Sequence, residues 1–451
     1  MFNNKQTWSL LENGQHDEYI VAYVNARVVD PESRTDYPGY LITSGKKIAD
    51  FGQGRIPDTL STKANEVIDC GGHIIMPGIV DIHVHLREPG GEHKETIDTG
   101  SRSAAAGGIT TVVCQPNTVP RIENVLVAKY LRMRSIESSC VNIEFYGAIT
   151  RSDGALCDMA SLKDAGALGF TDDGLPVMNA LSMKRAFEYA KELGVLVAQH
   201  AEDCNLSNGG CINDGMVSRE LGLRGIPDIS ESIMVNRDIQ LLREVPGAHY
   251  HVLHISTKKA LNAVKHAKEE GLNISCEVAP HHFVLNETAV LEHGSMAKMN
   301  PPLRTEEDRI SMIDGIKDGV IDCIATDHAP HDFQDKTQPI DCCSFGIVGL
   351  ETLLPLTLEL YHNEGIDLLD VLSKLTNRPA DIIKVPRGRI SRGAVADLVV
   401  FDLDFQWKID TARFSSKSQN SPFHGRVVRG KVLRTVVAGK TVYNSGALHV
   451  S

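Results

Sequence analysis

The chain has 451 residues and a formal net charge of -12 at pH 7; 42% of its residues are hydrophobic, 23% are charged and 5% are aromatic. This composition is ordinary for a soluble globular enzyme and excludes a disordered or fibrous chain. The acidic balance, without any basic stripe, excludes nucleic acid as an expected partner, because proteins bind phosphate backbones with clustered lysines and arginines. At this length we expect one large domain and a smaller one.

The chain begins with a mixed, polar segment that is neither a signal peptide nor a membrane anchor, and we treat residues 1–18 as an N-terminal extension. No later apolar run is long enough to span a bilayer, so we expect a cytoplasmic protein with no membrane partner. The ten cysteines are scattered singly apart from Cys342 and Cys343. Without any CxxC spacing, they do not indicate a thiolate metal site or a redox pair.

The two ends of the chain have the same character. Residues 19–72 contain "YIVAYVNARVVD" and "GYLITSGKKIADFG", and residues 386–451 contain "GAVADLVVFDLD" and "GKVLRTVVAGKTVY". These stretches alternate apolar and polar residues as strands do, with turn residues between them. We therefore expect a composite β-sandwich domain built from both segments, around a central segment of residues 73–385.

The central segment alternates short β-branched runs with helical stretches such as "NALSMKRAFEYAKEL" and "STKKALNAVKHAKEE". This alternation is typical of a parallel sheet with crossover helices, and eight such units predict an α/β fold of the (β/α)8 TIM-type barrel class. The eight runs are "IIMPGIVDIHVH", "ITTVVCQP", "VNIEFYGAI", "GALGFTDD", "GVLVAQH", "HYHVLHI", "NISCEVAP" and "IDCIATD".

Polar residues gather where these runs end, which is where a barrel of this kind builds its active site. His83 and His85 are two residues apart and share one face of a strand, although alone they are equally compatible with two histidines satisfied by hydrogen bonds. The other runs add imidazoles and carboxylates, and together these suffice for two zinc-like ions with a position left open for water. The residues are His83, His85, Asp173, His200, His254 and Asp327.

Such a site predicts hydrolytic chemistry. Divalent ions can lower the pKa of water towards neutrality and polarise a carbonyl group. Asp327 would then accept the proton of the attacking water and pass it to the leaving nitrogen, as a general base and acid.

The motifs "DIHVHLREPG", "FTDDG", "QH", "HVLHIS" and "ATDHAPH", in this order, resemble the amidohydrolase superfamily and specifically the class I dihydroorotases. The resemblance covers nearly the whole chain after the first seventeen or so residues. It implies that Asp173 is the bridging carboxylate that replaces a carboxylated lysine of many relatives. Asp172 stays an alternative, because neighbours in a strand point opposite ways. The implied metal ligands are His83, His85, Asp173, His200, His254 and Asp327.

The resemblance also implies a set of substrate contacts. Arg87 and Asn117 would hold the carboxylate of dihydroorotate, with a surface arginine and a simple turn former as the alternatives. The polar segment 332–343 has the length and composition of a mobile loop over the site. His281 and His282 are expected to be structural. The implied substrate-binding residues are His85, Arg87, Asn117, Asn300, His331, Phe345 and Gly346.

The implied activity is that of a dihydroorotase, which interconverts dihydroorotate and N-carbamoyl-L-aspartate in pyrimidine synthesis with one or two zinc ions. A hydantoinase, dihydropyrimidinase or allantoinase is the first alternative, but "FTDDG" has no lysine to carboxylate. The second is a non-catalytic scaffold for aspartate transcarbamoylase, but such scaffolds lose metal ligands. We expect a homodimer, with aspartate transcarbamoylase as a candidate partner; metal occupancy and the need for a partner subunit stay open.

Overall fold

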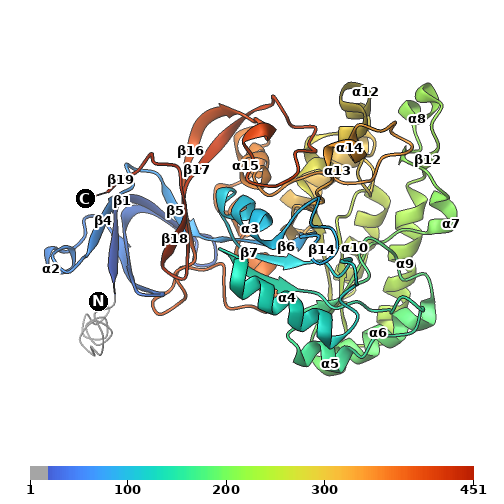
Figure 1. Ribbon diagram of the computed structural model, residues 1–451, viewed down its shortest axis with the longest axis horizontal. Coiled ribbons are helices and arrows are strands. Elements are labelled where there is room, and N and C mark those ends of the chain that lie inside the picture. Colours follow the sequence, from blue (N-terminus) through green and yellow to red (C-terminus); the bar gives the residue numbers. More distant parts are fainter. Residues whose placement is uncertain (1–18, 451) are drawn as a thin grey trace.

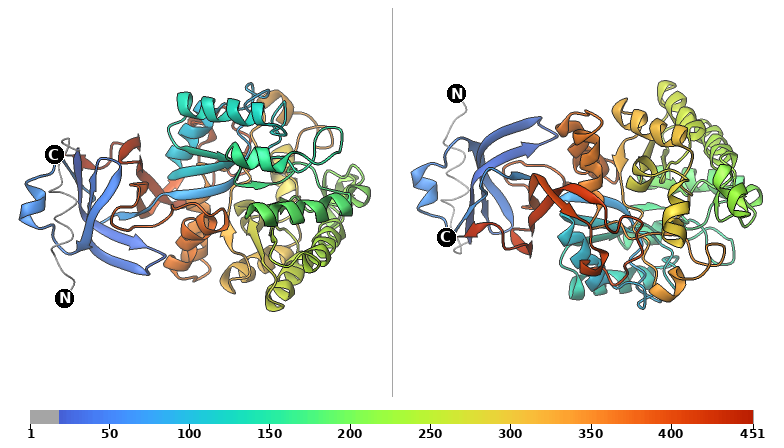
Figure 2. Two further views of the ribbon diagram at one scale, coloured as in Figure 1. Left: turned by 90° about the horizontal axis from the view of Figure 1, so that it is seen from below. Right: turned by 90° about the horizontal axis from the view of Figure 1, so that it is seen from above.

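The computed structural model describes residues 19–450, so the predicted N-terminal extension lies outside the described residues. Strands from both ends of the chain lie together at one side of the molecule, and the helix-rich central segment lies beside them (Figures 1 and 2). Two long strands near the end of the chain, β16 (Leu398–Lys408) and β17 (Val427–Val437), extend from the terminal strands over the helix-rich central segment (Figure 1).

A nine-stranded sheet unites the two ends of the chain. We call it the terminal sheet. Its main path runs β18-β17-β16-β5-β1-β2-β3, while β4 pairs with β1 and β19 with β4. Its strands are β1 (Ile20–Asp30), β2 (Thr35–Ser44), β3 (Lys47–Gln53), β4 (Glu66–Asp69), β5 (Ile74–Pro77), β16 (Leu398–Lys408), β17 (Val427–Val437), β18 (Lys440–Asn444) and β19 (His449–Val450).

The terminal sheet forms because its strands bury apolar residues against one another. Val28, Ile75, Leu398 and Val400 are fully buried in one cluster. β5 pairs with β1 in parallel and with β16 antiparallel, so it is the strand that joins the N-terminal part of the sheet to the C-terminal part.

The first predicted run, "IIMPGIVDIHVH", contains two strands rather than one. β5 belongs to the terminal sheet, and β6 (Ile79–Val84) begins the central segment. Gly78 separates them, and a Cβ at this position would come within 2.2 Å of the Thr110 side chain. The close approach of the two chains therefore requires glycine at the point where one sheet ends and the next begins.

The central segment contains parallel strands in two sheets, and each of the eight predicted runs contributes one of them. One sheet has the order β6-β7-β8 and the other β15-β14-β13-β10-β9. The α/β class is therefore confirmed. The strands after β6 are β7 (Ile109–Cys114), β8 (Asn142–Phe145), β9 (Gly169–Phe170), β10 (Leu196–Gln199), β13 (His249–Val252), β14 (Ile274–Val278) and β15 (Cys323–Ile324), with a separate pair β11 (Ile212–Asn213) and β12 (Gly225–Ile226).

Both quoted helical stretches are helices, α6 (Ala180–Leu193) and α10 (Lys258–Glu269). Asn179 caps α6 by accepting from the backbone of the first turn, and Gly194 ends the helix in the left-handed conformation at φ 69°. The other helices are α2 (Asp58–Ser61), α3 (Ile97–Ala106), α4 (Val125–Ser138), α5 (Met159–Asp164), α7 (Cys204–Ser207), α8 (Met216–Leu221), α9 (Ile229–Arg243), α11 (Pro280–Val284), α12 (Ala289–His293), η1 (Gly294–Ala297), α13 (Glu306–Lys317), α14 (Phe333–Lys336), α15 (Leu353–His362), α16 (Leu368–Ser373), α17 (Asn377–Ile382) and η2 (Thr411–Arg413).

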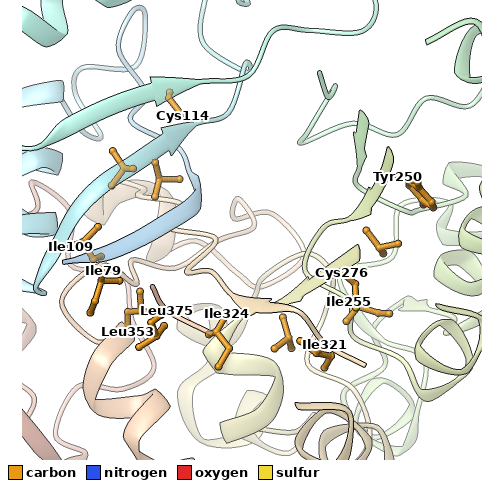
Figure 3. Packing of buried hydrophobic residues seen from close by; sticks show 14 of the residues in the cluster. Ile79, Ile109, Cys114, Tyr250, Ile255, Cys276, Ile321, Ile324, Leu353 and Leu375 are labelled. Atoms are coloured by element: carbon orange, nitrogen blue, oxygen red, sulfur yellow. The ribbon is translucent and has the colours of Figure 1, made fainter. Parts of the chain in front are cut away.

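A large apolar cluster fills the space between the central strands and their helices. Figure 3 shows part of it, with Ile79 and Ile109 close together and Ile255 near Cys276. This packing holds the strands, and with them the residues at the strand ends. Among residues 19–450, no helix has both the length and the apolar character required to cross a membrane.

Candidate active site

A pocket of about 290 Å³ opens at the carboxyl ends of the central strands. It brings together every residue predicted for the site except His83, which is fully buried. The lining residues are His85, Arg87, Asn117, Asp173, Gly174, His200, His254, Asn300, Asp327, Ala329, His331, Ser344, Phe345 and Gly346.

The imidazoles form two groups on either side of Asp173. On one side, the Nε2 atoms of His83 and His85 lie 3.3 and 3.4 Å from Oδ2 of Asp173. Oδ1 of Asp327 lies 3.1 Å from Nε2 of His85 and 3.5 Å from Nε2 of His83. We call His83, His85 and Asp327 the first subsite.

On the other side, His200 and His254 face the second oxygen of the same carboxylate. Nδ1 of His200 lies 3.6 Å, and Nε2 of His254 3.5 Å, from Oδ1 of Asp173, and the two nitrogens are 2.9 Å apart. We call this pair the second subsite. Asp173 lies between the subsites with one oxygen towards each.

Asp172 points the other way. Its carboxylate accepts hydrogen bonds from the backbone N–H groups of Ile149 and Thr150 at 2.9 and 3.0 Å, and from Arg121 at 2.8 Å. Its oxygens are therefore occupied in holding the loop after β8. Of the two neighbouring aspartates, the geometry places Asp173 in the pocket.

Three residues of the site have a positive φ angle, a backbone conformation that residues other than glycine rarely adopt. The φ angles are 62° for Arg87, 29° for His254 and 50° for Asp327. Each lies just beyond the end of a central strand: Arg87 follows β6, His254 follows β13 and Asp327 follows β15. Such strain costs on the order of 1–3 kcal/mol per residue and persists where the surrounding structure enforces it, which is common at functional sites.

Charge is concentrated in the pocket. Burial by itself would raise the pKa of Asp173, but the surrounding histidines hold it well below its ordinary value. Burial likewise opposes ionisation of Asp327, and the hydrogen bond from His85 with the nearby histidines reverses this and lowers its pKa. Both carboxylates are therefore ionised at neutral pH and favour a bound cation.

The donor set fits a divalent metal ion. Two overlapping groups, one of His83, Asp173 and His254 and one of His83, His85 and Asp327, have ligand atoms within 4.8 Å of one another. Oδ1 of Asp173 is buried without a hydrogen-bond partner among residues 19–450. A buried carboxylate oxygen without a donor is costly, and an ion between Asp173 and the histidines of the second subsite would satisfy it.

Arg87 lies at the side of the pocket and is not a surface arginine. It is half-buried, and it donates from Nε to the carbonyl of Pro330 at 3.2 Å while Nη2 lies 3.2 Å from Nε2 of His331. Lys94 contacts the other ring nitrogen of His331 at 3.1 Å. The guanidinium is held on two sides, which leaves a fixed cationic group facing the pocket.

Two amide side chains support the imidazoles. Oδ1 of Asn117 lies 3.0 Å from Nδ1 of His85. Asn300 donates to Glu202 at 2.6 Å, and Glu202 lies 3.0 Å from Nε2 of His200.

The predicted loop 332–343 contains the short helix α14. Lys336, which is fully buried, donates from Nζ to the carbonyls of Lys298, Ser344 and Gly346 at 3.1–3.2 Å. This lysine ties the loop to the segment containing Phe345. The mobility of the loop stays a prediction.

Glu202 and Glu277 are the supporting carboxylates that the motifs did not reveal. Glu277 lies on β14 and contacts Nδ1 of His83 at 2.5 Å. One sequence feature could have revealed Glu277, because it is the lone charged residue inside the apolar run "NISCEV". A strand buried on both faces accommodates a charged residue only with a partner. His281 and His282, expected to be structural, are absent from the pocket lining, and His282 donates to the carbonyl of Pro301 at 3.0 Å.

Solved structures of similar fold include a hydantoinase and a dihydropyrimidinase. L-Hydantoinase (dihydropyrimidinase) from Arthrobacter aurescens matches with a TM-score of 0.85 and 25% identity, over 95% of this chain and 97% of that chain. Dihydropyrimidinase from Brevibacillus agri NCHU1002 matches with a TM-score of 0.82 over 94% and 95% of the two chains; at 21% identity, it shows the fold alone.

Sequence comparison identifies the family to which the chain belongs. A family described as dihydro-orotase-like matches residues 72–260. The dihydroorotase of Anaplasma phagocytophilum (strain HZ) is 76% identical over 99% of this chain and 100% of that protein, and that of Ehrlichia chaffeensis (strain ATCC CRL-10679 / Arkansas) is 61% identical over 98% and 99%. The chain belongs to the dihydroorotase family and is a cyclic amidohydrolase.

Proposed function

We propose that the chain catalyses the reversible hydrolysis of the ring amide of (S)-dihydroorotate to N-carbamoyl-L-aspartate, a step of de novo pyrimidine synthesis in the cytoplasm. Water adds across the ring C–N bond: a C–O bond forms, the C–N bond breaks and the nitrogen gains a proton. The observation that carries the proposal is Arg87 facing the same pocket as Asp173 and Asp327.

The metal is zinc in this proposal, one or two ions per chain. His83, His85 and Asp327 would hold one ion, His200 and His254 the other, and Asp173 would bind between them. When bound, zinc supplies Lewis acidity, which polarises an amide carbonyl and makes a water molecule acidic enough to react at neutral pH.

Asp327 has the position and charge of the general base. It is ionised, it lines the pocket, and its Oδ1 lies 3.1 Å from Nε2 of His85. It would take the proton from the attacking water and deliver it to the ring nitrogen as that bond breaks.

The substrate carboxylate would lie against Arg87 and Asn117. A guanidinium binds a carboxylate through charge-assisted hydrogen bonds, which fixes both the orientation of the ring and the choice of ring. Asn300, His331, Phe345 and Gly346 would complete the contacts, and His85 would contact both substrate and metal.

We also propose that the two central sheets are halves of one (β/α)8 barrel within residues 73–385, and that residues 19–72 and 386–451 form a composite β-sandwich domain together with β5. Two parallel bridges support this architecture. One pairs Gly147 with Phe170 between β8 and β9, and the other pairs Val84 of β6 with His328 beyond β15. With these bridges each central strand has a neighbour on both sides.

The chain would work as a homodimer, with aspartate transcarbamoylase as a candidate partner. A purely non-catalytic scaffold is disfavoured, because the six predicted ligands are all present and gathered around one pocket.

A different cyclic amide is the second candidate, because the solved structures of similar fold include enzymes whose names specify hydantoins and dihydropyrimidines. Those rings carry no carboxylate, and Arg87 would then have no anionic partner.

Turnover of dihydroorotate, dihydrouracil and allantoin by the zinc-loaded chain separates these functions. Ring opening of dihydroorotate is followed by ultraviolet absorbance, with Asp327→Asn as the inactive control. We expect dihydroorotate to be preferred; turnover of a neutral ring alone would replace this proposal with the second candidate, and no turnover in any metal or with the partner enzyme would oppose both.

A further inference from the structure

The four histidines of the site differ in what their second ring nitrogen contacts. Each directs one nitrogen towards Asp173 or Asp327, and the other nitrogen points away from the pocket centre. The partner of this outer nitrogen differs among the four histidines: it is a fully buried carboxylate in one case and is absent in another. The difference follows the division into two subsites.

In the first subsite both outer nitrogens have acceptors. Nδ1 of His83 lies 2.5 Å from Oε1 of Glu277, and Nδ1 of His85 lies 3.0 Å from Oδ1 of Asn117. A histidine that donates from Nδ1 is held in the tautomer whose Nε2 carries the lone pair. Both Nε2 atoms therefore present lone pairs to the place where an ion would bind.

Glu277 is itself fixed in place. Its second oxygen, Oε2, lies 3.1 Å from Nε2 of His251, and Nδ1 of His251 lies 2.8 Å from the hydroxyl of Ser275. Glu277 is 1% exposed and His251 is fully buried. This chain of hydrogen bonds runs through the interior between β6, β14 and β13, away from solvent.

The second subsite has weaker support. Nε2 of His200 contacts Glu202, but this carboxylate is partly exposed, with 15% of its side chain accessible, and it also accepts from Asn300. Nδ1 of His254 is buried without a hydrogen-bond partner in the described part of the chain. No acceptor in residues 19–450 therefore holds a proton on Nδ1 of His254, as Glu277 and Asn117 do for the histidines of the first subsite.

His251 and Glu277 also form a group with Cys323 whose ligand atoms lie within 4.8 Å of one another. Both oxygens of Glu277 already accept hydrogen bonds from histidines, so a metal ion there would have to displace them. The group therefore serves as support for His83 rather than as a third metal site.

We infer that the two subsites hold metal unequally: the first subsite retains its ion more tightly than the second, and Glu277 is the positioning residue that causes the difference. This inference rests on the proposed function, since it concerns the same zinc ions. A carboxylate behind a ligating histidine fixes the ring and raises its basicity, and removal of such a partner typically weakens metal binding about 10- to 100-fold.

The test is zinc retention by the full-length chain. Zinc-loaded protein is equilibrated with increasing concentrations of a chelator, and zinc per chain is measured after removal of the chelator. Wild-type protein should lose its zinc in two steps. Glu277→Gln, which keeps the shape and removes the charge, should weaken the tighter step by about 10- to 100-fold.

Glu202→Gln is the matched control, because it makes the same change behind His200. It should shift only the weaker step. If a single zinc ion binds, His254→Asn should retain it and His83→Asn should lose it. These measurements on wild type, Glu202→Gln and the histidine variants remain decisive even where Glu277→Gln does not fold.

Several outcomes overturn the inference. Two ions lost in one step from an active enzyme would contradict unequal binding and leave the proposed function intact. If Glu202→Gln shifts the tighter step and Glu277→Gln does not, the tighter ion is held by the second subsite and the inference is wrong. A folded chain that binds no zinc would overturn the proposed zinc function, and the inference with it.

Discussion

The terminal sheet and the ends of the central strands are both buried, but with opposite kinds of residue. In the terminal sheet, Leu398 and Val400 of β16 lie in a cluster of buried hydrophobic residues. At the ends of the central strands the buried residues are ionised aspartates and histidines such as Asp173 and His83. Burial of apolar surface stabilises a fold, whereas burial of charge costs free energy unless a partner compensates.

This difference indicates that stability and chemistry are largely separate in the molecule. Changes in the terminal sheet should alter the free energy of unfolding, and changes around the pocket should alter turnover. The segment between η2 and β17 reaches the pocket through a buried contact: Ser416 donates to Glu95, and Glu95 contacts His328, the neighbour of Asp327.

The sharpest separation should come from Asp327→Asn. The amide cannot accept a proton, so we expect kcat/KM for dihydroorotate to fall by about 10²- to 10⁴-fold. The melting temperature should fall only slightly, because His83 and His85 lose a carboxylate partner while the apolar core is unchanged. Asp404→Asn, at an exposed position of β16, is the matched control and should change neither quantity.

Leu398→Ala tests the other region. Leu398 is fully buried, and the substitution leaves a cavity, which should cost about 2–5 kcal/mol in the free energy of unfolding measured with urea. The protein that remains folded at 25 °C should keep the kcat/KM of wild type. A folded Leu398→Ala protein without activity would show that the two regions are not separate.

Arg87→Met should weaken substrate binding with little effect on metal. Loss of a charge-assisted hydrogen bond to the substrate carboxylate costs about 1.5–3 kcal/mol, which corresponds to a fall of about 10- to 150-fold in kcat/KM. Zinc per chain should equal that of wild type in the same buffer. Parallel loss of zinc and substrate binding would mean that Arg87 supports the metal site instead.

The smallest expected effect concerns Glu351, which joins α3 to the segment between η2 and β17 by accepting from Ser103 at 2.9 Å and from the backbone N–H of Ser415 at 2.6 Å. Burial raises its pKa from 4.5 to about 7. The folded chain therefore holds a proton that the unfolded chain releases between these values, and the stability of the fold falls as pH rises from about 4.5 to about 7.

Glu351→Gln removes this pH dependence. The difference in the free energy of unfolding between the variant and wild type should favour the variant by on the order of 1 kcal/mol more at pH 8 than at pH 5. The melting temperatures of both proteins at the two pH values measure this difference. An equal difference at both pH values would mean that Glu351 is ionised in the folded chain.

Much of this arrangement was predictable from local pattern. Each of the eight central runs contains a strand, both quoted helices form, and the predicted site residues gather at one pocket with His83 directly beneath. Such features depend on periodicity and on motifs of a few residues. The roles of those residues stay predictions until the variants are measured.

Other features depend on contacts that no local pattern contains. Glu277 and His83 are 194 residues apart in the chain, and their contact becomes visible only when β6 and β14 are placed together. The division of the first run at Gly78 depends on Thr110 of the neighbouring strand. The choice of Asp173 over Asp172 depends on Arg121 and the loop that Asp172 holds.

The most direct test of the account is dihydroorotate turnover measured on the same sample as zinc content. The kcat/KM of protein stripped with chelator should rise as zinc is restored in steps, and it should return to zero when the zinc is removed again. Full turnover by zinc-free protein, or a fully loaded and folded chain that leaves dihydroorotate unchanged, would contradict it.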